Sequence, residues 1–197
     1  MDHPLQCRCG TIKGYVSLSG MTKRAICYCK DCQAFAHFLD DAARVLDRDG
    51  GTDVVATLPM QVRFVQGKDA LTCMSLSPRG LLRWYASCCN TAIGNTPRNF
   101  KTTYVGLVHT CLGSAASLQQ SFGPVQVKVN TKSAKHPVKS TPLSTVATVL
   151  ALIKTLVEAR LKGTYKDNPF FVPETGTPIV QPRELTKAER EQVTSAA

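Results

Sequence analysis

Short alternations of apolar and polar residues fill the first 125 residues of the chain, and this pattern is typical of β-strands. One alternating run extends from Ile12 to Leu18. Other short strands are predicted in MTKRAICYC, TDVVATL, MQVRFVQG and TTYVGLVHTCL, and LTCMSLSP pairs with LLRWYASCC in a hairpin. The segment DCQAFAHFLDDAARVL has helical spacing and predicts one or two helical turns. We therefore expect a mainly β fold, with an antiparallel β domain at residues 1–125.

A different pattern covers residues 126–197. A basic linker is followed by apolar residues at helical spacing, namely Val146, Val149, Leu150, Ile153 and Val157. Thr141 is expected to cap this helix, with Pro142 at its first position and Gly163 at its end. We expect this amphipathic helix and the proline-rich tail to pack on the β domain as a C-terminal extension. A helix that binds a partner or a membrane surface is the alternative. Residues 186–189 (TKAE) match a capping box for a short terminal helix.

The length and composition restrict the class of protein. A chain of 197 residues suits one domain with an extension, or two small domains. No apolar run reaches the roughly 18 residues of a membrane span, and the N-terminus lacks the pattern of a signal peptide. We therefore expect a protein of the reducing cytoplasm that does not bind a membrane.

Positive charge is concentrated in the centre of the chain. The net charge is +10, and no Asp or Glu occurs from Ala70 to Val157, a stretch that contains nine Lys and Arg residues. A region of this kind produces a positive field that attracts anions. A carboxylate or phosphate metabolite and a nucleic acid are both candidate ligands, and a basic surface with no ligand is the simplest alternative.

The chain contains nine cysteines, several of them in clusters. In a reducing cytoplasm, clustered thiols are more often metal ligands than disulfides. Zinc binds thiolates in a tetrahedron, and a structural site normally has four ligands. Cys7 and Cys9 supply two ligands, and Cys88 and Cys89 are the natural source of the others. Such a site would join the start of the domain to a strand about 80 residues away and would stabilise the fold.

A second group, Cys27, Cys29 and Cys32, has the pattern C-x-C-x-x-C. Three ligands on one turn leave the fourth zinc position to water or substrate, which is the arrangement of a catalytic site. Alternatively, Cys73, Cys111 or a histidine completes a structural site, or the thiols bind no metal. The sequence thus predicts one or two zinc ions.

Three segments, CRCGTIKGYVSLSG, CYCKDCQAF and RWYASCCNTAIG, carry a family resemblance. In order and spacing they resemble the C-x-C-G, C-x-C-x-x-C and C-x-x-C-G-T-P-L blocks of the glutathione-dependent formaldehyde-activating enzymes, a family that includes centromere-protein-V-like proteins. The resemblance covers residues 5–110 and implies a β-tent fold, in which zinc holds antiparallel sheets together. It also implies that Cys7 and Cys9 belong to a structural zinc site with Cys89, and that Cys27, Cys29 and Cys32 form the catalytic-type site.

The third block departs from the family pattern. Cys89 occupies the second cysteine position, but Ala86 occupies the first, which leaves Cys88 as the only nearby substitute. Asn90 replaces the family's glycine and tolerates the left-handed backbone conformation expected there. Ala92 replaces the family's proline, and the segment after residue 120 has no counterpart in the smaller family members.

The resemblance implies a zinc-dependent carbon–sulfur lyase-type enzyme that acts on a glutathione or thiol adduct of formaldehyde or a related small aldehyde. Arg79, Arg83 and Arg98 are candidates for orienting the carboxylates of glutathione. His37 and His109 are candidate proton carriers or spare ligands, although ordinary structural roles are more common, and Tyr28 either lines the site or packs in the core. The main alternative is a non-catalytic zinc-stabilised module that binds nucleic acid or a protein, and a third is a retained fold without activity.

Overall fold

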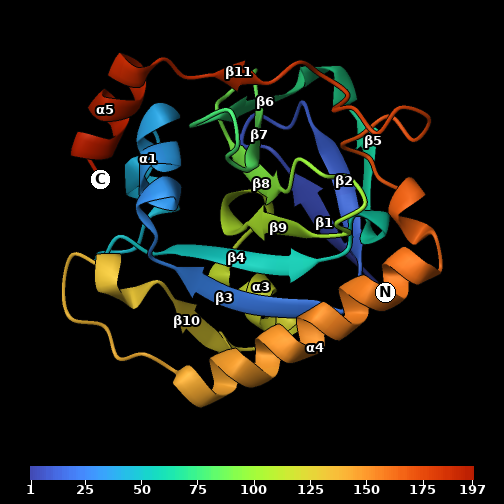
Figure 1. The fold of residues 1–197 in the computed structure, drawn as a ribbon, viewed down its shortest axis with the longest axis horizontal. Helices are drawn as coiled ribbons and strands as arrows, with labels where there is room; N and C mark the ends of the chain where they lie inside the picture. Colours follow the sequence, from blue (N-terminus) through green and yellow to red (C-terminus); the bar gives the residue numbers. More distant parts are fainter.

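The computed structural model describes residues 1–197, except for the side chain of Ser144. Its strands are β1 (Asp2–Gln6), β2 (Lys13–Ser17), β3 (Thr22–Cys27), β4 (Thr52–Thr57), β5 (Val62–Gln66), β6 (Leu71–Ser75), β7 (Leu82–Ala86), β8 (Ala92–Thr96), β9 (Val105–Val108), β10 (Val127–Val129) and β11 (Arg183–Glu184). Its α-helices are α1 (Lys30–Phe38), α2 (Ala42–Val45), α3 (Ala115–Phe122), α4 (Pro142–Leu161) and α5 (Lys187–Ser195) (Figure 1).

The strands form two sheets. Strands β1, β2 and β5 make an antiparallel three-stranded sheet, and the other strands make an eight-stranded sheet in the order β10-β3-β4-β9-β8-β7-β6-β11. The two edge strands, β10 and β11, pair in parallel with β3 and β6, whereas the inner pairs are antiparallel. Most of the regular structure is β-sheet, in agreement with the strand pattern of the sequence. Because the five α-helices described above accompany the sheets, the fold as a whole is mixed α/β.

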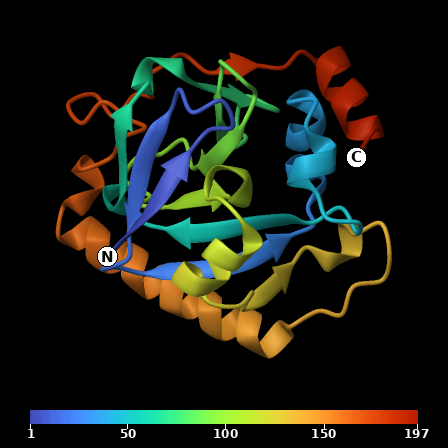
Figure 2. The same cartoon turned by 180° about the vertical axis from the view of Figure 1, so that it is seen from behind.

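Apolar cores lie on both faces of the eight-stranded sheet. The larger core includes Leu5 and Val16 of the small sheet together with Trp84 of β7, which is fully buried as its apolar setting in the sequence suggests. Figure 2 shows the β1–β2 hairpin on the side of the molecule that carries this core. The smaller core contains Phe35 and Leu39 at and after α1. Because the inner strands β8 and β9 are buried on both faces, they lack the alternation that marks a half-exposed strand.

Helix α5 packs beside α1 at one end of the molecule (Figures 1 and 2). The capping box predicted for it is present, since the Thr186 hydroxyl accepts a hydrogen bond from the Glu189 N–H and the Glu189 carboxylate accepts one from the Thr186 N–H. Arg183 extends the cap through an ion pair with Glu189. The sequence therefore determines both the existence and the start of this helix.

Helix α4 begins and ends where the sequence predicts, but its orientation differs from the expected one. The five apolar residues expected to pack on the β domain are exposed, and Ala159, on the opposite side, is the buried residue among the described side chains of α4. Figure 1 shows the helix along the outer margin of the molecule, below β3 and β10. The half-buried side of the helix carries Thr145, Thr148 and Thr155 together with Leu152 and Leu156, and the hydroxyl groups of Thr145 and Thr155 donate to carbonyl groups one turn earlier in the chain.

The rest of the C-terminal extension is joined closely to the sheets. Strand β10, which lies in the segment predicted as a basic linker, adds a parallel edge to β3. Phe170 and Phe171 of the tail are buried in the larger core, where Phe170 lies 5.1 Å from the ring centre of Trp84. In the described part of the chain, no helix is both long and apolar enough to cross a bilayer.

Candidate metal centres

Four cysteines from two distant segments meet at one end of the sheets. Cys7 and Cys9 follow β1 in a tight turn, and Cys88 and Cys89 lie in the turn between β7 and β8. Their Sγ atoms all lie within 4.8 Å of one another. This four-cysteine cluster therefore joins the three-stranded sheet to the eight-stranded sheet, which is the connection that the sequence predicts.

The spacing of the four sulfur atoms suits a tetrahedral metal. A zinc ion with Zn–S bonds of about 2.3 Å would hold its sulfur atoms about 3.8 Å apart. The Sγ of Cys7 lies 3.6 Å from that of Cys9 and 3.8 Å from that of Cys88, and Cys88 lies 3.3 Å from Cys9 and 3.8 Å from Cys89. The adjacent residues Cys88 and Cys89 thus both point into the cluster, so the donor set fits zinc.

The turns around the four-cysteine cluster supply hydrogen bonds to its sulfur atoms, and these lower the pKa of Cys9 and Cys89, whereas burial raises the pKa of Cys7 and Cys88. The Ile12 N–H donates to Cys7 Sγ at 3.2 Å, and the Thr11 hydroxyl lies 3.2 Å from Cys9 Sγ. The bonds from Thr11 are the main cause of the lowered pKa of Cys9, which is about 6. Asn90 has the left-handed conformation expected at this turn, with φ of 54°.

The second group lies where β3 meets α1. Cys27 is the last residue of β3, Cys29 is the N-cap of α1, and Cys32 is in the first turn of that helix. Their Sγ atoms also lie within 4.8 Å of one another, and among the described residues no other Cys, His, Asp or Glu joins this three-cysteine cluster. The Cys32 N–H donates to Cys29 Sγ at 3.4 Å, so the start of the helix directs N–H groups at the sulfur atoms.

Hydrogen bonds among the three thiols give them unequal pKa values. Hydrogen bonds from Cys29 and then Cys32 lower the pKa of Cys27 to about 2, and the resulting thiolate raises the pKa of both neighbours. Sulfur binds metal as thiolate, so a cation that enters the cluster replaces the protons of Cys29 and Cys32. The donor set therefore fits zinc, with three protein ligands.

A buried arginine lies beside the three-cysteine cluster. Arg83 of β7 is 2% exposed, and its Nη1 lies 3.9 Å from Cys32 Sγ and donates to Asn95 Oδ1 at 3.1 Å. Its guanidinium also lies over the ring of Phe35 at 5.5 Å. Asp31 is the nearest carboxylate, at 3.8 Å, and is half exposed. A buried cation in this position offsets the negative charge of thiolates at the cluster.

Asn130 approaches the cluster from the opposite side. It follows β10 with a left-handed φ of 56°, and its Nδ2 donates to Cys27 Sγ at 3.4 Å. The parallel pairing of β10 with β3 sets this contact, because Val129 is in register with Cys27. A surface cavity of about 490 Å³ lies between the segment around β10 and the start of α4, and its lining includes Lys128, Asn130, Ser140 and Val146. Its volume is in the range of small-molecule sites.

Tyr104, just before β9, is a further polar neighbour of the three-cysteine cluster. Burial raises its pKa to about 12, and the negative charges of Cys27 and Cys32 contribute to the increase. The phenol therefore keeps its proton and is a hydrogen-bond donor at neutral pH. Asn130 and Tyr104 have no signal in the sequence, since they reach the cluster only through sheet pairing.

The remaining candidates from the sequence lie outside both clusters. Cys73 and Cys111 are buried in the larger core, where burial raises the pKa of both thiols. His109 contacts the backbone carbonyl groups of Asp53 and Arg44, whereas His37 Nε2 is buried without a hydrogen-bond partner among the described atoms.

Arg79, Arg98 and Tyr28 have contacts or exposure unrelated to the cysteine clusters. Arg98 binds Glu184 and the backbone near Gly80, and Arg79 is exposed in the turn between β6 and β7. Tyr28 is buried, and its hydroxyl is 3.4 Å from Asp47. Of the three arginines proposed from the sequence, Arg83 is the one beside a cysteine cluster.

Comparison with known proteins adds one relationship. No curated protein matches the chain. The model of a family of unknown function, DUF6151, matches residues 2–181, a region that contains both cysteine clusters and α4. The match covers most of the sequence, and the chain therefore belongs to the family DUF6151.

Proposed function

We propose that this protein is a zinc-dependent enzyme of the carbon–sulfur lyase type, which acts on a thiol adduct of formaldehyde or a related small aldehyde. The observation that carries the proposal is the difference between the two clusters. One offers four sulfur ligands and suits a closed structural site, whereas the other offers three. Asn130, which donates to Cys27, also lines a surface cavity, although none of the three cysteines lines it. Glutathione is the thiol that the motif resemblance favours.

The resemblance to the glutathione-dependent formaldehyde-activating family, and the β-tent fold that it implies, are part of this proposal. The antiparallel inner strands and the joining of two sheets at Cys7, Cys9, Cys88 and Cys89 support it. In the motif RWYASCCNTAIG, Cys88 takes the place of a family cysteine that would lie two positions earlier, at Ala86. A set of four ligands is still compatible with this change, because the sulfur atoms of Cys88 and Cys89 both reach the cluster.

The reaction would join the thiol sulfur to the aldehyde carbon. The carbon–sulfur bond forms as the carbonyl π bond breaks, and the proton lost by the thiol is taken up by the new hydroxyl oxygen, so no oxidant or reductant is needed. Zinc at the three-cysteine cluster would supply a Lewis acid that favours the thiolate and polarises the carbonyl group. The reverse reaction releases the aldehyde from the adduct.

Residues of the chain would bind and orient the substrate. The cavity next to Asn130 is lined by Lys128 and by the hydroxyl groups of Thr131 and Ser140, which suit a carboxylate such as those of glutathione. Arg83 is too deeply buried to contact a substrate in that cavity and would instead stabilise the anionic cluster. Three thiolates and one Zn²⁺ have a net charge of 2 − 3 = −1, which the guanidinium offsets.

The test is the rate of exchange between glutathione, ¹³C-formaldehyde and their S-hydroxymethyl adduct, measured by NMR exchange spectroscopy on the zinc-loaded protein. We expect the wild type to accelerate exchange above the spontaneous rate. Cys29→Ser should reduce the acceleration by at least about 10- to 100-fold, the scale of losses at metal sites. Cys73→Ala, which removes a core thiol outside both clusters, is the matched control. A zinc-loaded wild type that leaves the spontaneous rate unchanged would refute the proposal.

A non-catalytic nucleic-acid-binding module is the second candidate. It is favoured by the absence of Asp and Glu from Ala70 to Val157 and by the lysines between β10 and α4. Binding of this kind depends on contacts with phosphates and weakens steeply as salt increases. Titration of labelled single- and double-stranded DNA and RNA at low ionic strength tests it, and absence of binding under these conditions rejects it.

A further inference from the structure

Helix α4 presents its aliphatic side chains to solvent. Seven large aliphatic residues of the helix are between 44% and 87% exposed: Leu143, Val146, Val149, Leu150, Ile153, Val157 and Leu161. The opposite side, which contacts the protein, contains Thr145, Thr148, Leu152, Thr155, Leu156 and Ala159 among its described residues. A surface helix normally has the reverse arrangement, with its apolar side toward the core. An exposed apolar surface of this kind is typical of a binding surface.

The spacing of the exposed residues indicates what kind of partner fits. Leu143, Val146, Leu150, Ile153 and Val157 are separated by three, four, three and four residues. This is the spacing of the first and fourth positions of a heptad, which form the contact line between two packed helices. We call these five residues the α4 seam. Leucine and β-branched residues are the usual occupants of such a line, so another helix is the expected partner.

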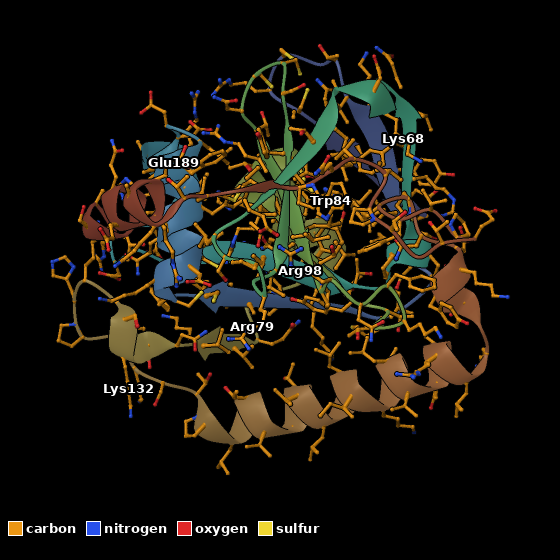
Figure 3. All side chains as sticks on the ribbon, turned by 45° about the horizontal axis from the view of Figure 1, so that its top comes forward. Lys68, Arg79, Trp84, Arg98, Lys132 and Glu189 are labelled. Carbon is orange, nitrogen blue, oxygen red and sulfur yellow. The ribbon has the colours of Figure 1, made fainter. Side chains whose placement is uncertain are left out.

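We propose that the α4 seam binds the α4 seam of a second copy of this chain, with the two helices antiparallel across a twofold axis. In this pairing Leu150 lies opposite Ile153 of the second copy, and Val146 lies opposite Val157. Each contact then occurs twice, as a twofold interface requires. Figure 1 shows α4 along the margin of the molecule, and Figure 3 shows side chains of this helix directed away from the sheets. All five seam residues are exposed, so the seam is accessible to a second copy.

Charge at the end of the seam favours the antiparallel arrangement. The next heptad position after Val157 is Arg160, which is exposed. In a parallel pair, Arg160 would lie opposite Arg160 of the second copy, and like charges at a contact line are unfavourable. In the antiparallel pair it lies opposite Leu143, and its aliphatic stem can pack there while the guanidinium reaches water. The five seam residues are all uncharged, which favours a copy of the same apolar seam over an acidic partner.

The expected dimer is concentration-dependent. A 20-residue helix is about 30 Å long, and one helix pair is at the lower end of specific interface sizes. Each copy carries a net charge of +10, so the two copies repel each other over long range, and added salt screens this repulsion. Dimerisation should therefore strengthen as NaCl increases. Binding to an anionic membrane through lysines such as Lys132 (Figure 3) would instead weaken as NaCl increases.

The experiment is sedimentation velocity on the full zinc-loaded chain from micromolar to several hundred micromolar concentration, at low and high NaCl. The 21.4 kDa wild type should approach twice that mass at high concentration. Ile153→Glu should weaken association by at least tenfold. Ala151→Glu, which places the same charge on an exposed position of α4 outside the seam, should leave association unchanged. Circular dichroism and zinc content verify that each variant is folded.

A second pair of variants tests the orientation. Leu143→Glu places a carboxylate opposite Arg160 in the antiparallel dimer, whereas Leu143→Lys places a second cation there. The antiparallel model therefore predicts that Lys weakens the dimer at least several-fold more than Glu. Equal weakening by both variants would reject this orientation. A wild type that stays monomeric at high concentration and high salt would reject the proposal, as would a dimer that Ile153→Glu leaves intact. Salt-sensitive binding of the monomer to phosphatidylserine vesicles through Ile153 would assign the seam to a membrane instead.

Discussion

Arg83 and Cys32 meet inside the protein, with the guanidinium Nη1 3.9 Å from the sulfur atom. One comes from β7 and the other from α1, and the arginine is almost fully buried. A buried cation requires a compensating negative charge. The thiolates of the three-cysteine cluster supply it, together with the more exposed Asp31. The contact thus links the smaller apolar core to the proposed reaction site.

This relationship predicts a selective effect of Arg83→Met on metal binding. Without the guanidinium, the three-cysteine cluster should bind zinc about 10- to 100-fold more weakly, while the four-cysteine cluster is unaffected. Competition with a chromogenic chelator measures the two affinities separately. Arg98→Met, which removes a half-buried arginine that pairs with Glu184 outside both clusters, is the control. Equal zinc affinity of wild type and Arg83→Met at both clusters would contradict the assigned role.

The two clusters should respond differently to loss of one thiol. Cys9→Ser removes a ligand that joins the two sheets, so it should impair folding, because metal binding energy at such a site becomes folding energy. Cys29→Ser should lose one zinc ion and mostly keep the fold. Zinc stoichiometry by atomic emission and thermal unfolding by circular dichroism measure both effects. If the wild type binds one zinc ion and Cys29→Ser retains it, the three-cysteine cluster is not a zinc site.

Removal of one partner of a buried ion pair between neighbouring strands should strongly destabilise the protein. Arg24 of β3 and Asp53 of β4 lie 2.6 Å apart, and Arg24 also donates to the carbonyl group of Gly123. Asp53→Ala leaves the guanidinium buried and unpaired, at a cost of about 3–5 kcal/mol. Asp49→Ala, whose partners Arg48 and His136 are both exposed, should cost less than about 1 kcal/mol. Chemical denaturation compares the two, and similar free energies of unfolding would exclude a special role for Arg24.

Helix α5 should become less stable in acid. The N–H of Thr186, then the Arg183 side chain, lowers the pKa of Glu189 below its ordinary value of 4.5. A carboxylate with a lowered folded-state pKa stabilises the folded state above its unfolded pKa, and this stabilisation is lost as pH falls through the folded pKa. Hydrogen exchange of α5 amides from pH 6 to pH 3 should show the loss. Glu189→Gln should abolish this pH-dependent difference, and an identical pH profile in the two proteins would contradict the cap.

The sequence by itself determined the features that depend on near neighbours. Alternation predicted the strands with one exposed face, the capping residues predicted the starts of α4 and α5, and cysteine spacing predicted the three-cysteine cluster and each half of the four-cysteine cluster. Asn90 was expected in a left-handed conformation, which it has. These predictions succeed because backbone preferences, caps and short cysteine patterns act over a few residues.

The tertiary structure alone decided which distant groups meet. Asn130 reaches Cys27 only because β10 pairs in parallel with β3, and Arg83 reaches Cys32 only because β7 lies in the same sheet as β3 behind α1. The sequence pattern also could not determine which side of α4 faces the protein. The apolar spacing predicts an amphipathic helix, but it does not say whether the apolar side faces the sheets or the solvent. Strand order and the space left beside the sheet edge determine that choice, and both depend on the packing of the whole chain.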